Sequence, residues 1–159
     1  MAGLDDRFRG MRSFAFFLVV VCVLVGIPSL FPPGVWYQSL AKPSWTPPPW
    51  AFPVAWIPLY LAIVVAGWRL WLAEVSATRT VALWLWGIQL GFNCLWSPFF
   101  FGLQQMTAAL VTCLALLASI AACIGWFRHV SPLAMWLFVP YGLWVAFATA
   151  LNAAIVAMN

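Results

Sequence analysis

The side chains in this sequence best suited to chemistry are neutral amides and aromatic rings spaced as on helices. Gln89, Asn93 and Trp96 fall on one face of an expected helix, because successive helical residues are about 100° apart. Trp56 and Tyr60 share a face of another expected helix. Amides supply hydrogen bonds and indoles supply flat apolar walls, so these faces favour the binding of a planar, uncharged molecule.

A third expected helix carries Tyr141, Trp144, Ala148 and Asn152 on one face. Tyr37 and Trp45 lie ahead of all three helices. If these faces converge, they enclose an aromatic-walled cavity, since each buried ring contributes about 150–250 Å² of contact area. We predict ligand binding by Tyr37, Trp45, Trp56, Tyr60, Gln89, Asn93, Trp96, Tyr141, Trp144 and Ala148.

Residues for conventional catalysis are scarce in this chain. The sequence offers no acid–base pair or activated nucleophile, and its ionisable side chains lie at or beyond the ends of the apolar runs. His129 is a lone loop histidine and the four cysteines lie singly inside apolar runs, so we expect no metal site and interpret the cysteines as packing residues. Any redox chemistry would use the ligand itself, with Trp56 and Trp144 as candidate photoredox partners.

Apolar runs of membrane-spanning length must hold these residues in place. The chain is 66% hydrophobic and 6% charged, whereas soluble domains are about 45–50% apolar and about 25% charged. Five runs near the roughly 20 residues that cross a bilayer predict an all-α integral membrane protein, a bundle of five transmembrane helices in a single domain, residues 1–159. A short polar arm precedes the expected helices, which cover residues 13–30, 52–73, 80–101, 106–127 and 132–158.

A segment rich in tryptophan and proline, residues 31–51, separates the first two expected helices. Proline biases the residue before it toward extended geometry, so the run from Lys42 to Pro49 should be stiff and non-helical. Pro53 suits the first turn of the next helix, where the missing N–H is not needed. We therefore expect a structured loop, called the lid from here on.

The distribution of basic residues indicates an orientation. With five spans, all six arginines lie on the side of the N-terminus and Lys42 lies on the other side. The positive-inside rule then predicts a multi-pass protein of a bacterial cell membrane with a cytoplasmic N-terminus. An outer membrane, where that rule does not decide orientation, is the alternative. Such charges set topology, and no nucleic-acid partner is expected.

Gly87 and Gly91 lie on the helix face opposite Asn93. A Gly-x-x-x-Gly pair allows another helix backbone to approach closely in a membrane. We expect these glycines to form a homodimer interface, with close packing inside the same chain as the alternative.

Three motifs together resemble the TspO/MBR family, the translocator and tryptophan-rich sensory proteins. One is W-x-P-P-x-W-x-F-P-x-x-W-x-x-L-Y, and the others are Gly91-Phe92-Asn93 with Trp96 and Phe99-Phe100, and Pro140-Tyr141 with Trp144, Ala148 and Asn152. The first motif is carried here by Trp45, Pro47, Pro48, Trp50, Phe52, Pro53, Trp56, Leu59 and Tyr60. The resemblance covers nearly the whole chain.

This resemblance implies a five-helix, often dimeric protein that binds porphyrins, benzodiazepine-type drugs and, in animals, cholesterol. The positions that match the family's ligand pocket are Tyr37, Trp56, Asn93, Trp96, Trp144 and Ala148. The last helix lacks the aromatic and basic residues associated with sterol binding, which weakens the expectation of high-affinity cholesterol recognition.

Three functions remain open from the sequence. The first is a membrane binding or transport-type protein for porphyrins such as protoporphyrin IX, with a regulatory or stress-sensing role and no obligatory cofactor. The second is light-dependent degradation of bound porphyrin by an enzyme-like protein. The third is a membrane scaffold whose aromatic core serves packing alone.

The five-span topology can be checked by cysteine labelling. Ser44→Cys and Ser76→Cys lie in links expected on opposite sides of the membrane, so a membrane-impermeant thiol reagent should label them from opposite sides of sealed vesicles. Wild-type protein measures background labelling of the four native cysteines. Labelling of both positions from the same side would rule out this topology.

Overall fold

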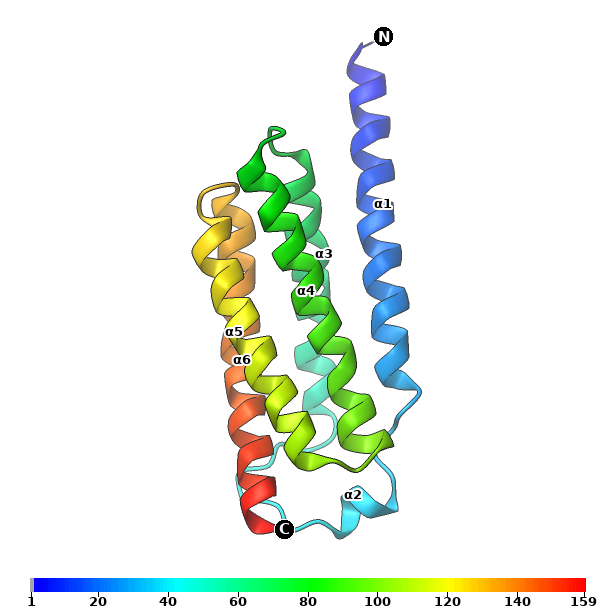
Figure 1. Ribbon diagram of the computed structural model, residues 1–159. Coiled ribbons are helices and arrows are strands. Elements are labelled where there is room, and N and C mark those ends of the chain that lie inside the picture. Colours follow the sequence, from blue (N-terminus) through cyan, green and yellow to red (C-terminus); the bar gives the residue numbers. More distant parts are fainter. Residues whose placement is uncertain (1) are drawn as a thin grey trace.

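Five long helices form the body of the molecule. The computed structural model describes residues 2–159, with side chains described from Gly10 onward, and this part of the chain consists of helices and connecting loops (Figure 1). It confirms the all-α fold class. The elements are α1 (Ala2–Ser29), α2 (Val35–Ser39), α3 (Ala51–Leu72), α4 (Ala77–Ser97), the π-helical turn η1 (Pro98–Gly102), α5 (Met106–Phe127) and α6 (Pro132–Met158).

Four helices are long and apolar enough to cross a bilayer: Gly10–Ser29 of α1, and α3, α5 and α6. The fifth long helix, α4, has 21 residues but a more polar composition. Its Gln89 and Asn93 have exposed fractions of only 0% and 6%, so these polar side chains face the interior of the bundle. The bundle is therefore completed by a helix whose Gln89 and Asn93 are turned away from lipid.

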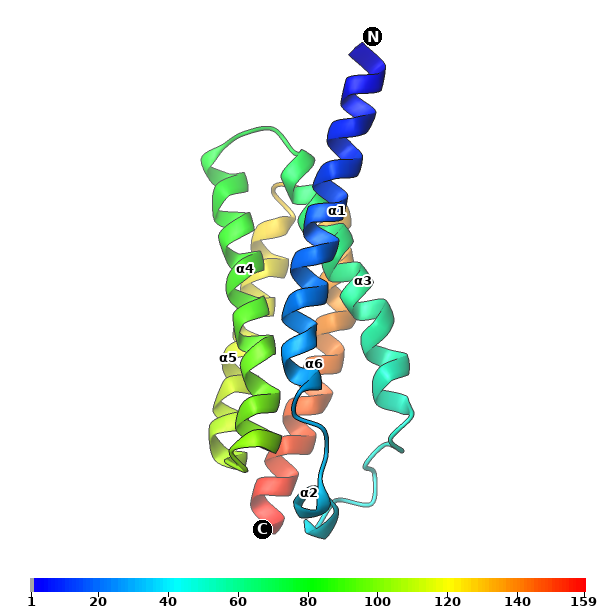
Figure 2. The ribbon, with the colours of Figure 1, turned by 90° about the vertical axis from the view of Figure 1, so that its right-hand side faces the viewer.

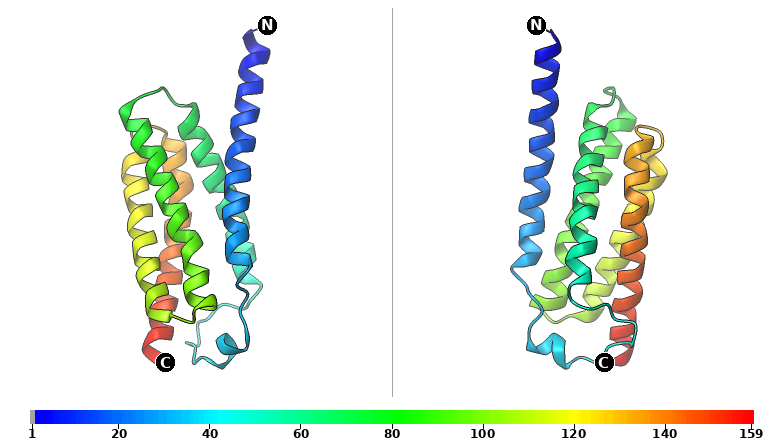
Figure 3. Two further views of the ribbon diagram at one scale, coloured as in Figure 1. Left: turned by 45° about the vertical axis from the view of Figure 1, so that its right-hand side comes forward. Right: turned by 180° about the vertical axis from the view of Figure 1, so that it is seen from behind.

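Helix α1 begins earlier than the sequence analysis suggested. The segment expected to be a polar arm before residue 13 is helical from Ala2, and it projects past the ends of the other helices (Figures 1 and 3). Extending an existing helix adds one hydrogen bond per residue, which favours this continuation. Farther along α1, Phe17 and Val21 are buried against the bundle.

The end of α1 is joined to α4 by an unusual hydrogen bond. Pro28 has no N–H to donate to the Leu24 carbonyl one turn earlier. The Cys94 thiol of α4 donates to that carbonyl instead, with 3.2 Å between sulfur and oxygen. A proline inside α1 thus creates an acceptor that a neighbouring helix uses.

Gly67 sets the spacing of α1, α3 and α4, which lie together in Figure 2. A Cβ atom at Gly67 would lie only 2.6 Å from Cε2 of Trp86 and 2.7 Å from Cδ1 of Phe17. These rings pack edge to face, with centroids 5.0 Å apart, and the Trp86 indole donates to the Ile63 carbonyl at 2.9 Å. Glycine is needed here because any side chain would displace two packed rings.

The helix expected over residues 80–101 does not remain regular to its end. From Pro98 it widens into η1, where the Leu103 N–H donates to the Pro98 carbonyl at 2.8 Å. Phe100 of this turn is buried. A Cβ at Gly102 would lie 2.7 Å from a ring carbon of Phe31, so this turn and the lid are in close contact.

The lid between α1 and α3 is ordered by a short helix and by turns. Residues 35–39 form α2, and the proline-rich run from Lys42 to Pro49 is non-helical. The Ala41 N–H donates to Oδ1 of Asn159 at 3.0 Å, and Nδ2 of Asn159 donates back to the Ala41 carbonyl at 3.0 Å. This pair of bonds fastens the middle of the lid to the end of α6.

The connections divide between two ends of the bundle. The N-terminus and the α3–α4 and α5–α6 connections lie at one end, whereas the lid, the α4–α5 connection and the C-terminus lie at the other (Figure 1). Arg69, Arg79 and Arg128 belong to the first end and Lys42 to the lid. The asymmetry of charge in the sequence thus corresponds to two opposite ends of the helices.

Candidate ligand-binding site

A cavity of about 850 Å³ lies beneath the lid. This volume is in the upper part of the roughly 300–1,000 Å³ range typical of small-molecule sites. Its wall is mostly apolar and aromatic, and it is formed by the lid, the end of α1, η1 and the neighbouring parts of α3, α4, α5 and α6. Among the described wall residues, Lys42 of the lid is the one with a charged side chain.

Seven of the ten residues expected at a ligand site line this cavity. They come from the lid, α3, α4 and α6, so segments far apart in sequence meet around one space. These residues are Tyr37, Trp56, Tyr60, Asn93, Trp96, Trp144 and Ala148.

Trp56 of α3 is the centre of the aromatic wall. It stacks on Tyr60 one turn along the helix, with ring centroids 5.0 Å apart and planes 20° apart. Across the bundle it meets Trp144 of α6 edge to face, with centroids 6.5 Å apart and planes 88° apart. Phe52 extends this wall toward the lid by packing against Trp144 at 6.1 Å. The two indoles therefore present surfaces from different helices to the same cavity.

A chain of hydrogen bonds crosses the bundle beside the cavity. The Tyr60 hydroxyl donates to Asn93 Oδ1 at 3.3 Å, and Asn93 Nδ2 donates to the Tyr141 hydroxyl at 3.0 Å. The Tyr141 hydroxyl then donates to Gln89 Oε1 at 3.0 Å, and Gln89 Nε2 donates to the Trp86 carbonyl at 2.9 Å. Each polar group is thereby satisfied in an interior where an unpaired one is costly.

Two of the expected ligand residues, Gln89 and Tyr141, belong to this chain but do not line the cavity. Both have an exposed fraction of 0%. Along the chain of hydrogen bonds, Tyr60 and Asn93 come first from the cavity, and Tyr141 and Gln89 follow behind them. They support the wall residues from behind.

Trp45 is also separate from the cavity wall. Its side chain is 48% exposed and packs edge to face against Phe147 of α6, with centroids 5.7 Å apart. The proline-rich run is neither an α-helix nor a strand, so helical spacing in the sequence does not determine which face of the lid a ring occupies. Trp50, 66% exposed, lies outside as well.

Tyr37 and Lys42 form the lid side of the cavity. The Tyr37 ring packs edge to face on Phe100 and Phe101 of η1, with centroid distances of 6.0 and 5.4 Å. The Lys42 ammonium lies 4.6 Å from the Tyr37 ring centroid and donates to the Leu40 carbonyl at 3.1 Å. Burial raises the pKa of the Tyr37 phenol above its ordinary value, because the interior disfavours the charged phenolate.

Three residues of the wall keep a buried polar atom without a hydrogen-bond partner. These atoms are Nε1 of Trp96, Nε1 of Trp144 and Oδ1 of Asn152. Buried polar groups are normally paired, so unpaired ones on a cavity wall call for an explanation. A ligand with acceptor atoms could pair the indole N–H groups after small side-chain adjustments.

Comparison with known proteins places this arrangement in a family. Residues 14–158 match the TspO/MBR family. The chain belongs to the TspO/MBR family. It is 37% identical over 150 residues to Protein CrtK of Rhodobacter capsulatus, covering 94% of each chain. It is 40% identical over 124 residues to the Tryptophan-rich sensory protein of Cereibacter sphaeroides, covering 78% of this chain and 77% of that protein.

A relative from animals shows similar identity. The Translocator protein of Homo sapiens is 42% identical over 120 residues, covering 74% of this chain and 70% of that protein. The resemblance inferred from the tryptophan, proline and asparagine motifs is thereby confirmed. Family membership and the apolar helices together identify an integral membrane protein.

Several wall residues of this TspO/MBR chain are not among those expected from the sequence. Phe101 enters the wall through the π-helical turn, and Lys42 enters through the fold of the lid. Cys113 and Leu116 belong to α5, which is apolar all round in sequence and gives no signal for an inward face. Asn152, which the sequence places on the same helix face as Ala148, also lines the wall.

The hydrogen-bonded chain predicts a loss of stability in Tyr141→Phe. This change keeps the ring but leaves Asn93 Nδ2 and Gln89 Oε1 without partners, so the free energy of unfolding should fall by about 1–3 kcal/mol. Thermal unfolding in detergent measures the effect. Tyr37→Phe is the control, because that residue packs through its ring. Equal midpoints for the two variants would mean that the chain adds little stability.

Proposed function

We propose that this TspO/MBR protein binds porphyrins and related planar hydrophobic ligands beneath the lid, in a transport-type, regulatory or stress-sensing role. The observation that carries the proposal is the large aromatic cavity lined by Trp56 and Trp144. A packing core would be filled to high density, so an open space of about 850 Å³ argues against a role as scaffold alone.

The distribution of polar groups suits a tetrapyrrole with a flat apolar ring and carboxylate side chains. The ring would lie against the indoles, and stacked aromatic pairs add roughly 0.5–1.5 kcal/mol beyond buried area. The carboxylates would lie toward Lys42, the charged residue on the lid side. The N–H groups of Trp96 and Trp144 would donate to acceptor atoms of the ligand.

Light-dependent breakdown of the bound porphyrin is a second candidate function. The edge-to-face contact of Trp56 and Trp144 favours it, because two indoles would lie beside the excited ring and could donate an electron to it. The wall residues otherwise provide no acid–base pair for catalysis. This activity would therefore depend on the porphyrin as the light-absorbing partner.

Titration with protoporphyrin IX, first in the dark and then under illumination, separates these functions. We expect saturable quenching of indole fluorescence, and Trp56→Ala or Trp144→Ala should weaken binding roughly tenfold to hundredfold through lost apolar contact. Trp136→Ala is the matched control, because Trp136 is 65% exposed and lies outside the cavity wall. Absence of saturable binding would leave the scaffold function.

Bleaching at saturating ligand tests the electron transfer separately. Trp56→Phe and Trp144→Phe keep an aromatic wall but remove the indole donor, so they should bleach bound porphyrin more slowly than Trp136→Phe. Stable absorbance of wild type under light would support binding without degradation.

We propose that the protein lies in a bacterial cell membrane with its N-terminus on the cytoplasmic side. Arg69, Arg79 and Arg128 lie at the same end of the bundle, and the lid with Lys42 lies at the opposite end. Basic residues are enriched on the cytoplasmic side. The cavity would then open toward the outer side through the lid.

We also propose a homodimer formed through the outer face of α4. Gly87 and Gly91 are exposed, and a Cβ at either position would meet no atom of another helix within 4 Å. The glycines therefore do not serve packing inside the chain, which was the alternative. They leave a shallow surface between exposed Trp84 and Leu95 on which a second α4 can pack closely.

Replacing both glycines tests this dimer. In Gly87→Leu/Gly91→Leu the new side chains would hold two α4 helices apart, so cross-linked dimer in bilayers should decrease severalfold while the monomer fold is retained. Gly10→Leu/Gly125→Leu is the control, because these glycines also have open space around them but lie on α1 and α5. An unchanged dimer fraction would place the interface on another helix.

A further inference from the structure

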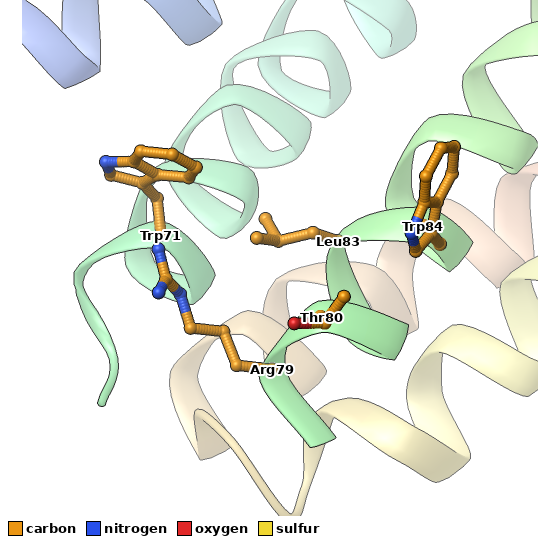
Figure 4. Close-up of a pocket in the computed structure, with 5 residues that line it drawn as sticks. All are labelled: Trp71, Arg79, Thr80, Leu83 and Trp84. Atoms are coloured by element: carbon orange, nitrogen blue, oxygen red, sulfur yellow. The ribbon is translucent and has the colours of Figure 1, made fainter. Parts of the chain in front are cut away.

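A second pocket lies at the arginine-bearing end of the bundle, far from the lid. Its volume is about 350 Å³, and it is lined by Trp71 of α3 and by Arg79, Thr80, Leu83 and Trp84 of α4. Figure 4 shows the Arg79 side chain reaching from α4 to the indole of Trp71, with Thr80 and Leu83 between this pair and Trp84. The pocket thus has a cationic side and an apolar side.

The protein holds Arg79 in place but leaves a buried N–H donor of its guanidinium group without a hydrogen-bond partner. Its guanidinium carbon lies 4.8 Å from the Trp71 ring centroid, a cation–π contact that fixes the side chain. Its Nε is buried and has no hydrogen-bond partner. Guanidinium presents five N–H donors in a planar fork that matches the oxygens of phosphate. A buried donor beside an open pocket therefore points to an anionic ligand.

The backbone around Arg79 reinforces the positive potential. Arg79 lies in the first turn of α4, a helix of 21 residues with no acidic residue in that turn. The Ser76 side chain accepts the Arg79 N–H at 3.1 Å, which fixes the start of the helix. The helix N-terminus carries a partial positive charge, so it adds to the attraction for an anion at this point.

The apolar side of the pocket faces the region that lipid occupies. Trp84 of α4 is 70% exposed and Trp71 of α3 is 49% exposed, and α3 is long and apolar enough to cross a membrane. Tryptophan is enriched where the hydrocarbon meets the headgroups, and a phosphate bound to Arg79 at this level would have its acyl chains running past Leu83 and Trp84. Free inorganic phosphate has no acyl chain and would not make these apolar contacts.

We propose that this pocket binds the headgroup phosphate of an anionic phospholipid. Arg79 is the anion-binding residue, Trp71 positions its guanidinium, and Leu83 and Trp84 contact the first part of an acyl chain. Binding there would join the end of α3 to the start of α4 through lipid. This site is independent of the porphyrin site at the lid end.

Native mass spectrometry of the full chain with equimolar phosphatidylglycerol and phosphatidylcholine tests the proposal. Wild type should bind the anionic lipid preferentially, and Arg79→Gln should reduce that preference about fivefold, the contribution of one basic residue near a charged membrane surface. Arg128→Gln removes an exposed arginine at the same end of the bundle and is the matched control. Thermal unfolding with phosphatidylcholine alone verifies that both variants remain folded.

Two outcomes would overturn the lipid site. The first is a preference for phosphatidylglycerol that falls equally in Arg79→Gln and Arg128→Gln, which would show a general effect of charge. The second is displacement of the bound lipid by millimolar inorganic phosphate, which would show that the pocket recognises the free anion. Retention of the lipid in phosphate, together with a selective loss in Arg79→Gln, supports the proposal.

Discussion

The buried chain from Tyr60 through Asn93 and Tyr141 to Gln89 is the constraint on which the bundle depends. Lipid offers no water to a polar group that loses its partner, so α3, α4 and α6 must keep the rotation and depth at which these side chains meet. Apolar packing alone tolerates sliding and rotation of helices much better than a set of directional bonds does. The polar chain therefore makes one arrangement of three helices strongly preferred.

This arrangement leaves room for a cavity on one side of the polar chain. Toward the arginine-bearing end, large rings such as Trp86 and Phe17 pack tightly around Gly67. Toward the lid, α4 widens into η1 and the interior is left open between the aromatic walls. One end of the molecule thus has a dense core that holds the helices together, and the other end holds a space whose shape the lid completes.

Helical periodicity accounts for what could be predicted from the sequence. It correctly separates the buried Gln89 and Asn93 from the exposed Gly87 and Gly91, because that distinction depends only on angle around one helix axis. Periodicity does not show whether an inward residue lines a space or stands behind another residue. For this reason Tyr141 was expected in the cavity wall, although it lies behind it. The position of Trp45 and the Cys94–Leu24 bond depend on tertiary contacts and on prolines, for which sequence spacing carries no signal.

The paired hydrogen bonds between Asn159 and Ala41 have a consequence for exchange of molecules with the cavity. A lid fastened at its middle must lose both bonds before it can swing away from α6, whatever occupies the space beneath it. For a ligand of the proposed site that enters past the lid, this requirement would add to the barrier for entry and for departure alike, whereas contacts with the aromatic walls would set the affinity. The Asn159 amide would then lengthen residence time and slow association together, leaving the equilibrium constant nearly unchanged.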